Sequence, residues 1–341
     1  MKSIALDAMG GDHGPKVVMP AAKQAILNFS DVELILVGDQ EKLNAELEKY
    51  QLAQEKRIKI HHASQVVTMD EKPAHALKKK KDSSMRVAIN LVKSQTVQAC
   101  VSAGNTGALM ATSKYVLKTI SGISRPAICT LLPTMRGHSL MLDLGANVEC
   151  TPDQLLQFAL MGSVLSSSVD GIKKPTIGLL NIGSEAIKGN ETIKAASKLI
   201  SDTELNFHGF IEGDDIYKGT VDVVVTDGFV GNVSLKTGEG LASLFNHVLK
   251  QQFKNNWYSK LAAIIALPVL NAVRKILDPG QYNGASLLGL NGIVIKSHGS
   301  ADINSYFNAI KIAVIEIDKN VPKRISIELD TYFKQVENKS L

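Results

Sequence analysis

The fold is decided by the stretch Val221-Asp-Val-Val-Val-Thr-Asp227-Gly-Phe-Val-Gly-Asn232-Val-Ser-Leu-Lys236-Thr-Gly-Glu-Gly240. Its β-branched apolar run predicts a buried strand, the Asp-Gly pair predicts a tight turn, and the spacing beyond predicts a helix. The first turn of a helix offers unpaired backbone N–H groups and a positive dipole end, which together bind anions. Many such turns bind nothing, so one copy is a weak signal.

The chain repeats this strand, turn and helix pattern. The copies lie at residues 2–29, 98–115, 176–191 and 221–240. Alternating strands and helices predict an α/β fold with a doubly wound, mostly parallel sheet. Segments 127–132 and 140–144 add a hairpin of two antiparallel strands. Because such sheets gather their turns at the carboxyl ends of the strands, the four turns should meet in one crevice.

Composition excludes several classes of function. The 341 residues are 45% hydrophobic, which suits one large core or two medium ones. A net charge of +5 with 5% aromatic residues does not favour nucleic-acid binding. Cys100, Cys129 and Cys150 stand apart beside apolar residues, as reduced thiols do. The first residues lack the organisation of a signal peptide, so we expect a cytoplasmic protein.

Known cofactor and catalytic patterns are missing. Neither the dinucleotide fingerprint nor the Walker A order occurs, and no zinc spacing, Ser-His-Asp order or carboxylate pair stands out. The acidic run 212–215 suits a solvated turn better than a metal site. We therefore expect no cofactor and no metal.

What the turns share is hydrogen-bond donors. We expect a site that grips a small polyanion and stabilises developing negative charge, without a covalent enzyme intermediate. Helix capping alone remains an alternative for the turn at 102–107, and a turn role for His298. The donor side chains are Ser102, Asn105, Thr106, Asn147, Asn181, Lys188, Asn232 and Lys236.

Two other segments suggest surfaces for partners. Lys78–Lys81 is a run of like charge, which is either a solvated face or a contact for an acidic macromolecule or phosphate. Residues 261–273 are uncharged, and Trp257 and Tyr258 precede them. As a helix this stretch covers about 20 Å, too short for a hydrocarbon core of about 30 Å. It suits packing against a second copy, contact with a membrane surface, or both.

Several motifs, taken together and in order, resemble the bacterial phosphate acyltransferase family over residues 1–334. They are Asp7-Ala-Met-Gly-Gly-Asp-His-Gly14, Ser102-Ala-Gly-Asn-Thr-Gly107, Asp143-Leu-Gly-Ala-Asn147, Asn181-Ile-Gly-Ser-Glu185 with Lys188-Gly-Asn-Glu191, Thr226-Asp-Gly-Phe-Val-Gly-Asn232 and Lys296-Ser-His-Gly-Ser300. The resemblance implies an enzyme that converts acyl-acyl-carrier protein and inorganic phosphate to acyl phosphate in phospholipid synthesis. It also implies a fold similar to phosphotransacetylase and to isocitrate and isopropylmalate dehydrogenases, a homodimer, and peripheral attachment to the inner face of the cell membrane.

The resemblance gives individual residues expected roles. Lys188 would orient phosphate or polarise the thioester carbonyl, and Asn232 would donate to the oxyanion. Lys78, Lys79, Lys80 and Lys81 would dock the acidic carrier, and Trp257, Leu261, Ile264, Ile265, Leu267 and Leu270 would contact the membrane. Substrate and phosphate binding would fall to Asp7, Gly10, Gly11, Asp12, His13, Ser102, Asn105, Thr106, Asp143, Asn147, Asn181, Gly189, Asp227, Gly231, Lys236 and His298.

The expected organisation is one domain over 1–334, with a protruding helical hairpin at 241–282, and a tail at 335–341. Two rival functions stay open. One is a phosphotransacetylase that uses acyl-CoA, and the other is a non-catalytic, membrane-associated scaffold. A dehydrogenase is disfavoured by the missing cofactor fingerprint.

Overall fold

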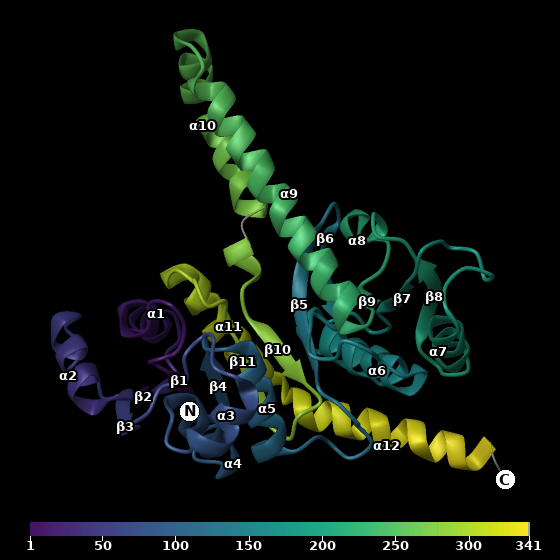
Figure 1. Ribbon diagram of the computed structural model, residues 1–341, viewed down its shortest axis with the longest axis horizontal. Coiled ribbons are helices and arrows are strands. Elements are labelled where there is room, and N and C mark those ends of the chain that lie inside the picture. The colour runs from purple at the N-terminus through teal and green to yellow at the C-terminus, as the bar shows by residue number, and fades with distance from the viewer. Residues whose placement is uncertain (278, 340–341) are drawn as a thin grey trace.

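The computed structural model describes residues 1–277 and 279–339, and these form one large sheet with helices on both faces (Figure 1). Eleven strands of the described residues make up the sheet. In spatial order they are β3 (Ile58–His62), β2 (Val32–Gly38), β1 (Lys2–Asp7), β4 (Ala99–Ser102), β11 (Ile293–Lys296), β10 (Ala285–Leu288), β5 (Ala127–Thr134), β6 (Gly137–Leu142), β9 (Val223–Val225), β7 (Thr176–Leu180) and β8 (Asn206–Ile211). The predicted α/β class, with its mostly parallel sheet, is confirmed.

The sheet consists of two parallel sets of strands that run in opposite directions. β3, β2, β1, β4 and β11 are parallel to one another, as are β6, β9, β7 and β8. Between them, β10 is antiparallel to both of its neighbours, and β5 and β6 form the predicted hairpin. Three antiparallel pairings in a row therefore reverse the direction. The expectation that all four turns leave one edge of the sheet is wrong, because the sequence pattern did not reveal strand β10.

Helices cover both faces of each half of the sheet. In the first half, α1 (Pro15–Asn28), α2 (Gln40–Lys49) and α11 (Ile303–Lys319) share a core on one face. On the opposite face lie α3 (Pro73–Lys79), α4 (Ser84–Lys93) and α5 (Thr106–Leu117). In the second half, α6 (Pro152–Val169), α7 (Glu191–Ser201) and α12 (Val321–Lys339) pack on one face, and α8 (Asp215–Lys218) lies on the other. Helix α12 includes most of the segment expected as a tail; residues 340–341 lie outside the described residues.

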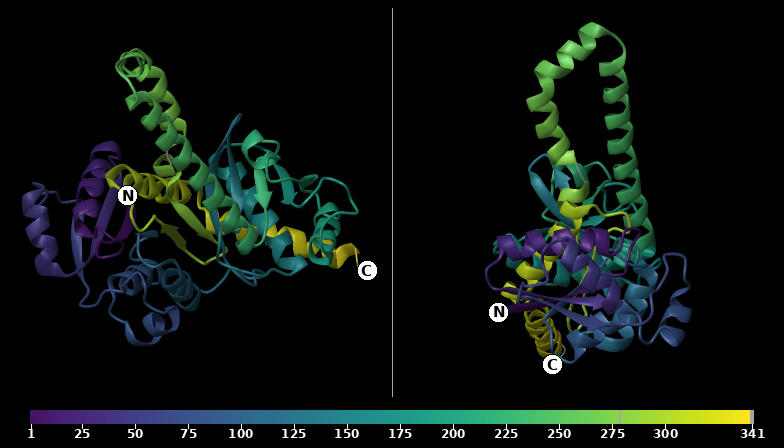
Figure 2. Two further views of the ribbon diagram at one scale, coloured as in Figure 1. Left: turned by 45° about the horizontal axis from the view of Figure 1, so that its top comes forward. Right: turned by 90° about the vertical axis from the view of Figure 1, so that its left-hand side faces the viewer.

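Helix α9 (Gly228–Lys254) and helix α10 (Trp257–Leu277) pack against each other as a long hairpin. The hairpin projects from the body, as two views at right angles show (Figures 1 and 2). Its first residues contact the second half of the sheet through Leu235. The chain returns through the short helix η1 (Pro279–Tyr282) to β10, in the middle of the sheet.

Local capping explains where the site-bearing helices begin. The Asp227 carboxylate accepts a hydrogen bond from Val230 N at 2.8 Å and so caps α9. Thr151 and Gln154 form the predicted capping box at the start of α6, with Pro152 at its first position.

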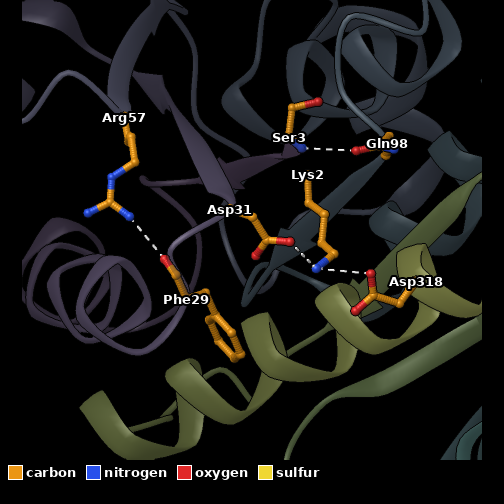
Figure 3. A network of polar contacts seen from close by, with 7 residues as sticks. All are labelled: Lys2, Ser3, Phe29, Asp31, Arg57, Gln98 and Asp318. Carbon is orange, nitrogen blue, oxygen red and sulfur yellow. Dashed lines mark hydrogen bonds and ion pairs between the residues drawn. The ribbon is translucent and has the colours of Figure 1, made fainter.

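The amino-terminal edge of β1 is tied down by polar contacts (Figure 3). The Lys2 ammonium lies 2.6 Å from Asp31 and 2.9 Å from Asp318 of α11, and these carboxylates raise the pKa of Lys2. Ser3 N donates to Gln98 Oε1 at 3.0 Å, and Arg57 donates to the Phe29 carbonyl at 2.9 Å. These contacts fix one end of the strand, and the turn that carries Gly10 leaves the other end.

Candidate functional site

Three turns meet at the carboxyl ends of β1, β4 and β11, where they approach too closely for side chains. Gly11 has φ +79°, and a Cβ added there would lie 2.8 Å from Ala103 Cβ and 2.9 Å from the Gly299 carbonyl oxygen. A Cβ at Gly10 would lie 2.9 Å from Gly104 N. Asp12 N also donates to the Gly299 carbonyl at 2.9 Å. Only glycine allows this approach, so the sequence motifs at 7–14, 102–107 and 296–300 are brought together as one group of turns.

Asp7 and Ser102 form the floor of this first group. Both are 1% exposed, and the Ser102 hydroxyl donates to Asp7 Oδ2 at 2.6 Å. Gly104 N donates to the Ser102 hydroxyl at 3.1 Å. Burial raises the pKa of Asp7, and the bond from Ser102 opposes that shift. Asp7 and Ser102 thus connect the end of β1 to the β4 turn by buried hydrogen bonds.

A recess opens at the first turn of α1, beside this floor. His13 and Gly14 line it together with Ala103, Gly299 and the buried Tyr306, around about 180 Å³ of empty space that includes its open mouth. Gly14 is the N-cap of α1 and supplies no side-chain cap. Within this first turn Pro15 has no N–H, and the N–H groups of Val17 and Val18 donate to the Gly14 carbonyl at 3.2 Å, so the turn is closed by its own backbone.

Asn105 caps a helix and fastens a neighbouring segment. Its Oδ1 caps α5 by accepting from Ala108 N at 2.9 Å, directly before Thr106, the first helical residue. Its Nδ2 donates to the carbonyl oxygens of Met69 and Glu71 at 2.7 and 3.0 Å. Both ends of the amide are therefore used within the protein, and they fasten the segment that leads into α3.

A second group of turns follows β6 and β9 and is built around Asp143. This carboxylate is fully buried and accepts four N–H bonds, from Ile128 N, Ala146 N, Asn147 N and Asn147 Nδ2, at 2.7 to 3.1 Å. Burial raises the pKa of Asp143, and the four hydrogen bonds oppose that shift. Asn147 also donates to the Pro126 carbonyl at 2.9 Å. Asp143 and Asn147 shape the turn and present no free donor.

The same group positions Asn232. Gly228 N donates to the Asn147 carbonyl at 2.7 Å, and a Cβ at Gly231 would lie 1.8 Å from the Asp143 carbonyl oxygen. Helix α9 therefore lies directly against the β6 turn. Asn232, one residue further, is exposed and lies beside Gly145, whose added Cβ would be 3.6 Å from Asn232 Cβ. Its amide forms no hydrogen bond within the residues described, so it remains available to a ligand.

Lys188 lies on the neighbouring turn, after β7. β7 pairs with β9 in parallel, with Leu179 opposite Val225, so both turns leave the same edge of the sheet. Asn181 Nδ2 donates to the Gly183 carbonyl at 3.0 Å, and Gly189, with φ +89°, packs against Asn181 Oδ1. Lys188 is exposed, and its ammonium has no hydrogen bond or ion pair in the described part of the chain. Lys188 and Asn232 are thus free polar groups on adjacent turns.

Helix α9 connects the two groups of turns. Asn232 and Lys236 are one helical turn apart and share a face of α9. Lys236 is ion-paired with Glu239 at 2.7 Å. Burial lowers the pKa of His298, and the positive charges of Lys236 and then Lys296 lower it further. The face of α9 that carries Asn232 therefore also faces the β11 turn of the first group.

Two residues of this region were not predicted as site residues, although one of them, Lys296, begins a motif quoted above. Lys296, at the end of β11, is 7% exposed, and burial lowers its pKa to about 8. Asn283 donates to Ser297 Oγ and the Ser305 carbonyl at 2.8 and 2.7 Å, and accepts from His298 N at 2.9 Å. The Asn-Gly pair at 283–284 gave only a turn signal, and a lysine at a strand end gave none.

The expected partner surfaces are both exposed. Lys78, Lys79 and Lys81 are exposed and Lys80 is half-buried, with no ion pair to any of the four in the ranges described. On the hairpin, Trp257 is 63% exposed and Ile265 75% exposed, and Leu261, Ile264 and Leu267 are exposed too; Leu270 is half-buried. Over the described ranges, no helix has both the length and the apolar character needed to cross a bilayer. The same residues contain no cluster of three His, Cys, Asp or Glu side chains suited to a metal ion.

The fold is one that is known from a solved structure. The structure of a phosphotransacetylase from Streptococcus pyogenes has the same fold, with a TM-score of 0.65 at 17% identity over 93% of this chain and 94% of that one.

The sequence then identifies the family. A sequence model described as "Fatty acid synthesis protein" matches residues 2–324. A phosphate acyltransferase from Nitrosococcus oceani is 58% identical over 333 residues, and one from Methylococcus capsulatus is 57% identical; each match covers 98% of both chains. The chain belongs to this family, the phosphate acyltransferases, which are enzymes.

Proposed function

We propose that the chain transfers an acyl group from acyl-acyl-carrier protein to inorganic phosphate and so supplies acyl phosphate for phospholipid synthesis. Phosphate acyltransferase activity implies these two substrates. The observation that carries the proposal is the pair Lys188 and Asn232, free polar side chains on the adjacent turns after β7 and β9. The other asparagines of the turns are occupied by internal hydrogen bonds.

The chemistry needs no nucleophile from the protein. A phosphate oxygen attacks the thioester carbonyl carbon and forms a C–O bond, the carbonyl electrons move to oxygen, and the C–S bond breaks as they return. The carrier leaves as a thiolate, which takes a proton from solvent; its pKa near 8.5 makes it a good leaving group. What the site has to supply is positioning and stabilisation of negative charge.

Lys188 and Asn232 match these two requirements. An ammonium carries a full charge and three donors, so Lys188 orients the phosphate or polarises the thioester carbonyl. The neutral amide of Asn232 donates to the oxyanion of the tetrahedral intermediate. Lys236, on the same face of α9 as Asn232, adds positive charge, and His298 of the neighbouring β11 turn adds a proton carrier.

The test is acyl phosphate formation trapped with hydroxylamine, with Lys188→Ala and Asn232→Ala compared to the parent enzyme. Loss of one oxyanion donor costs on the order of a hundredfold or more in kcat, so Asn232→Ala should fall by about that factor. Lys188→Ala should also weaken the dependence on phosphate. Normal turnover with unchanged phosphate dependence in both variants would rule out these roles.

The two rivals are separated by the same assay. A phosphotransacetylase would use acyl-CoA in preference to the acylated carrier when both compete for phosphate. A scaffold would form no acyl phosphate with either donor. Family membership favours the acyltransferase over the scaffold.

The lysine run supports a carrier-docking surface. Lys78 and Lys79 lie in the last turn of α3, and the segment before α3 is fastened to the β4 turn by Asn105. An acidic carrier bound to these lysines would lie beside the first group of turns. Charge complementarity of this kind raises association rates and selects partners.

The α9–α10 hairpin supports a second surface. Its exposed apolar residues exceed what a protein leaves in water without a partner. We propose that they pack against a second copy of the chain, with the segment from Trp257 to Leu270 also touching the inner face of the cell membrane. Such attachment is peripheral, since the helices lie on a membrane surface without crossing it.

A further inference from the structure

Lys296 is the one buried lysine or arginine among the residues that the structure describes. The residue is 7% exposed and forms no ion pair within 4 Å. Burying an ammonium without a close counter-ion is costly, and such groups concentrate at functional sites. Its place at the end of β11, beside the β4 turn, makes a role in the site worth testing.

The hydrogen bonds of Lys296 connect two turns of the first group, and charges from the third act on it. Its ammonium donates to the Ala103 carbonyl of the β4 turn at 3.4 Å and to the Ser297 carbonyl of its own turn. Asp7 and Asp12, from the β1 turn, are the negative charges that stabilise its charged form. One cation therefore holds carbonyl groups from two turns under the influence of carboxylates from the third.

The same ammonium acts on His298, two residues further along. The charged groups that face His298 are Lys236 and Glu239 from α9, Lys296 from β11 and Asp12 from the β1 turn. The ring of His298 also lies 2.9 Å from the Ser300 hydroxyl. The two lysines oppose protonation of the ring, and the two carboxylates favour it.

We propose that Lys296 is a positioning residue of the acyltransferase site. It ties the β4 turn to the β11 turn and places a positive charge beside the His298 ring. The role rests on the proposed function, because it matters to catalysis only if phosphate and thioester are bound at these turns. Lys296 acts through the turns and His298. Its loss should therefore lower kcat, the rate at which the bound complex reacts, more than it weakens binding of the carrier.

The experiment compares Lys296→Met with Lys296→Arg. Methionine has an unbranched side chain of similar length but carries no charge, whereas arginine keeps the charge. Lys23→Met is the matched control, since the Lys23 ammonium also donates to a backbone carbonyl, that of Tyr50 at 3.1 Å, away from the site. Kinetics are measured by the hydroxylamine assay. The pKa of His298 is measured by NMR on histidine-labelled full-length protein, with His298→Gln to assign the signal.

Lys296→Met should lower kcat by roughly tenfold or more, because small misplacements of site groups are costly. The KM for the acylated carrier should change by less than about twofold, since the lysine run is intact. The pKa of His298 should rise by roughly half a unit or more when the neighbouring charge is lost. Lys296→Arg should restore the pKa and only part of kcat, and Lys23→Met should change neither.

A folded Lys296→Met protein with lower thermal stability but unchanged kcat and unchanged His298 titration would overturn the proposal. If Lys296→Met does not fold, the arginine variant decides: a parental kcat there contradicts a positioning role. Failure of the parent enzyme to form acyl phosphate would instead refute the proposed reaction, and the NMR result would be unaffected.

Discussion

At the scale of single residues, the asparagines of the site turns do two different jobs. Asn105, Asn147 and Asn181 use their amides to hold turns and helix starts in place. Asn232 alone among these four has an amide left for a ligand in the residues described. The hydrogen-bond partners thus separate three asparagines that hold the turns from one, Asn232, that is open to the proposed role in the reaction.

Gly231 offers a test of how Asn232 is positioned. A Cβ there would lie 1.8 Å from the Asp143 carbonyl oxygen, so Gly231→Ala must push α9 away from the β6 turn. We expect a loss of stability of about 1–3 kcal/mol, as for other overpacked sites, and a large drop in kcat. Urea unfolding and the hydroxylamine assay measure the two effects.

Gly240→Ala is the matched control on the same helix, because a Cβ there meets nothing within 4 Å. It should keep full activity and gain up to about 1 kcal/mol from better helix propensity. Parental stability and parental activity in Gly231→Ala would show that the close approach of α9 does not position Asn232.

At the scale of elements, α3 joins a basic surface to the site. The helix is short, and its position depends on the two hydrogen bonds from Asn105 to the chain just before it. Pro73, its first residue, packs close to Gly107 of α5. A carrier bound at the lysine run would therefore lie on a helix that is connected to the β4 turn by these hydrogen bonds and by the contact of Pro73 with Gly107.

Charge reversal at Lys78 and Lys79 should weaken binding of the acylated carrier and reduce its dependence on salt. The expected signature is a higher KM for the carrier with kcat nearly unchanged, because docking is remote from the chemistry. Reversal of the exposed pair Lys173 and Lys174 makes the same change in net charge elsewhere and should have no effect. Equal effects of the two double variants would mean that only overall charge matters and that α3 is not the docking site.

At the scale of the whole molecule, the hairpin and the body differ in how they place their apolar residues. The body buries its apolar residues between sheet and helices, whereas many apolar residues of α9 and α10 are exposed. These two helices project away from the body (Figure 2). A surface of this kind in a stable protein indicates a partner or a membrane. The hairpin is therefore the segment in which we expect contacts with a second copy of the chain or with a membrane surface.

The double variant Ile264→Glu and Leu267→Glu should abolish binding to phospholipid vesicles in a flotation assay. Two buried carboxylates at an apolar surface are strongly unfavourable. Ile327→Glu, at a residue 55% exposed on α12, is the control and should still float with the vesicles. Sedimentation of the same proteins reports the oligomeric state. Retained vesicle binding, or loss of the dimer instead, would favour packing between copies as the function of this segment.

Local pattern predicted most of the elements, because strands, turns and helix caps leave short-range signals. The 127–144 hairpin, the capping box at Thr151 and the start of α9 after Asp227 were all predicted and confirmed. Strand direction was not predictable, since it depends on β10, a four-residue strand whose partners lie far away in sequence.

The candidate site was predictable as a set of segments but not as a set of roles. Motif spacing predicts Asp143 and Asn105 as site residues but does not predict the hydrogen bonds by which they hold the turns and a helix start. Those bonds run to Ile128, Met69 and Glu71, whose nearness follows only from the folded chain. Lys296 was missed for the same reason, because its burial is a property of three turns together.

Helix α9 carries Asn232 near its first turn and continues to Lys254. At 1.5 Å per residue, the far end lies about 30 Å from that amide, which is close to the diameter of a small protein domain. A single stiff rod thus serves as a spacer between the reacting groups and whatever the tip rests on. Under the proposed membrane contact, a distance of that size between tip and site leaves clearance for a small carrier to enter from the side and to depart once unloaded.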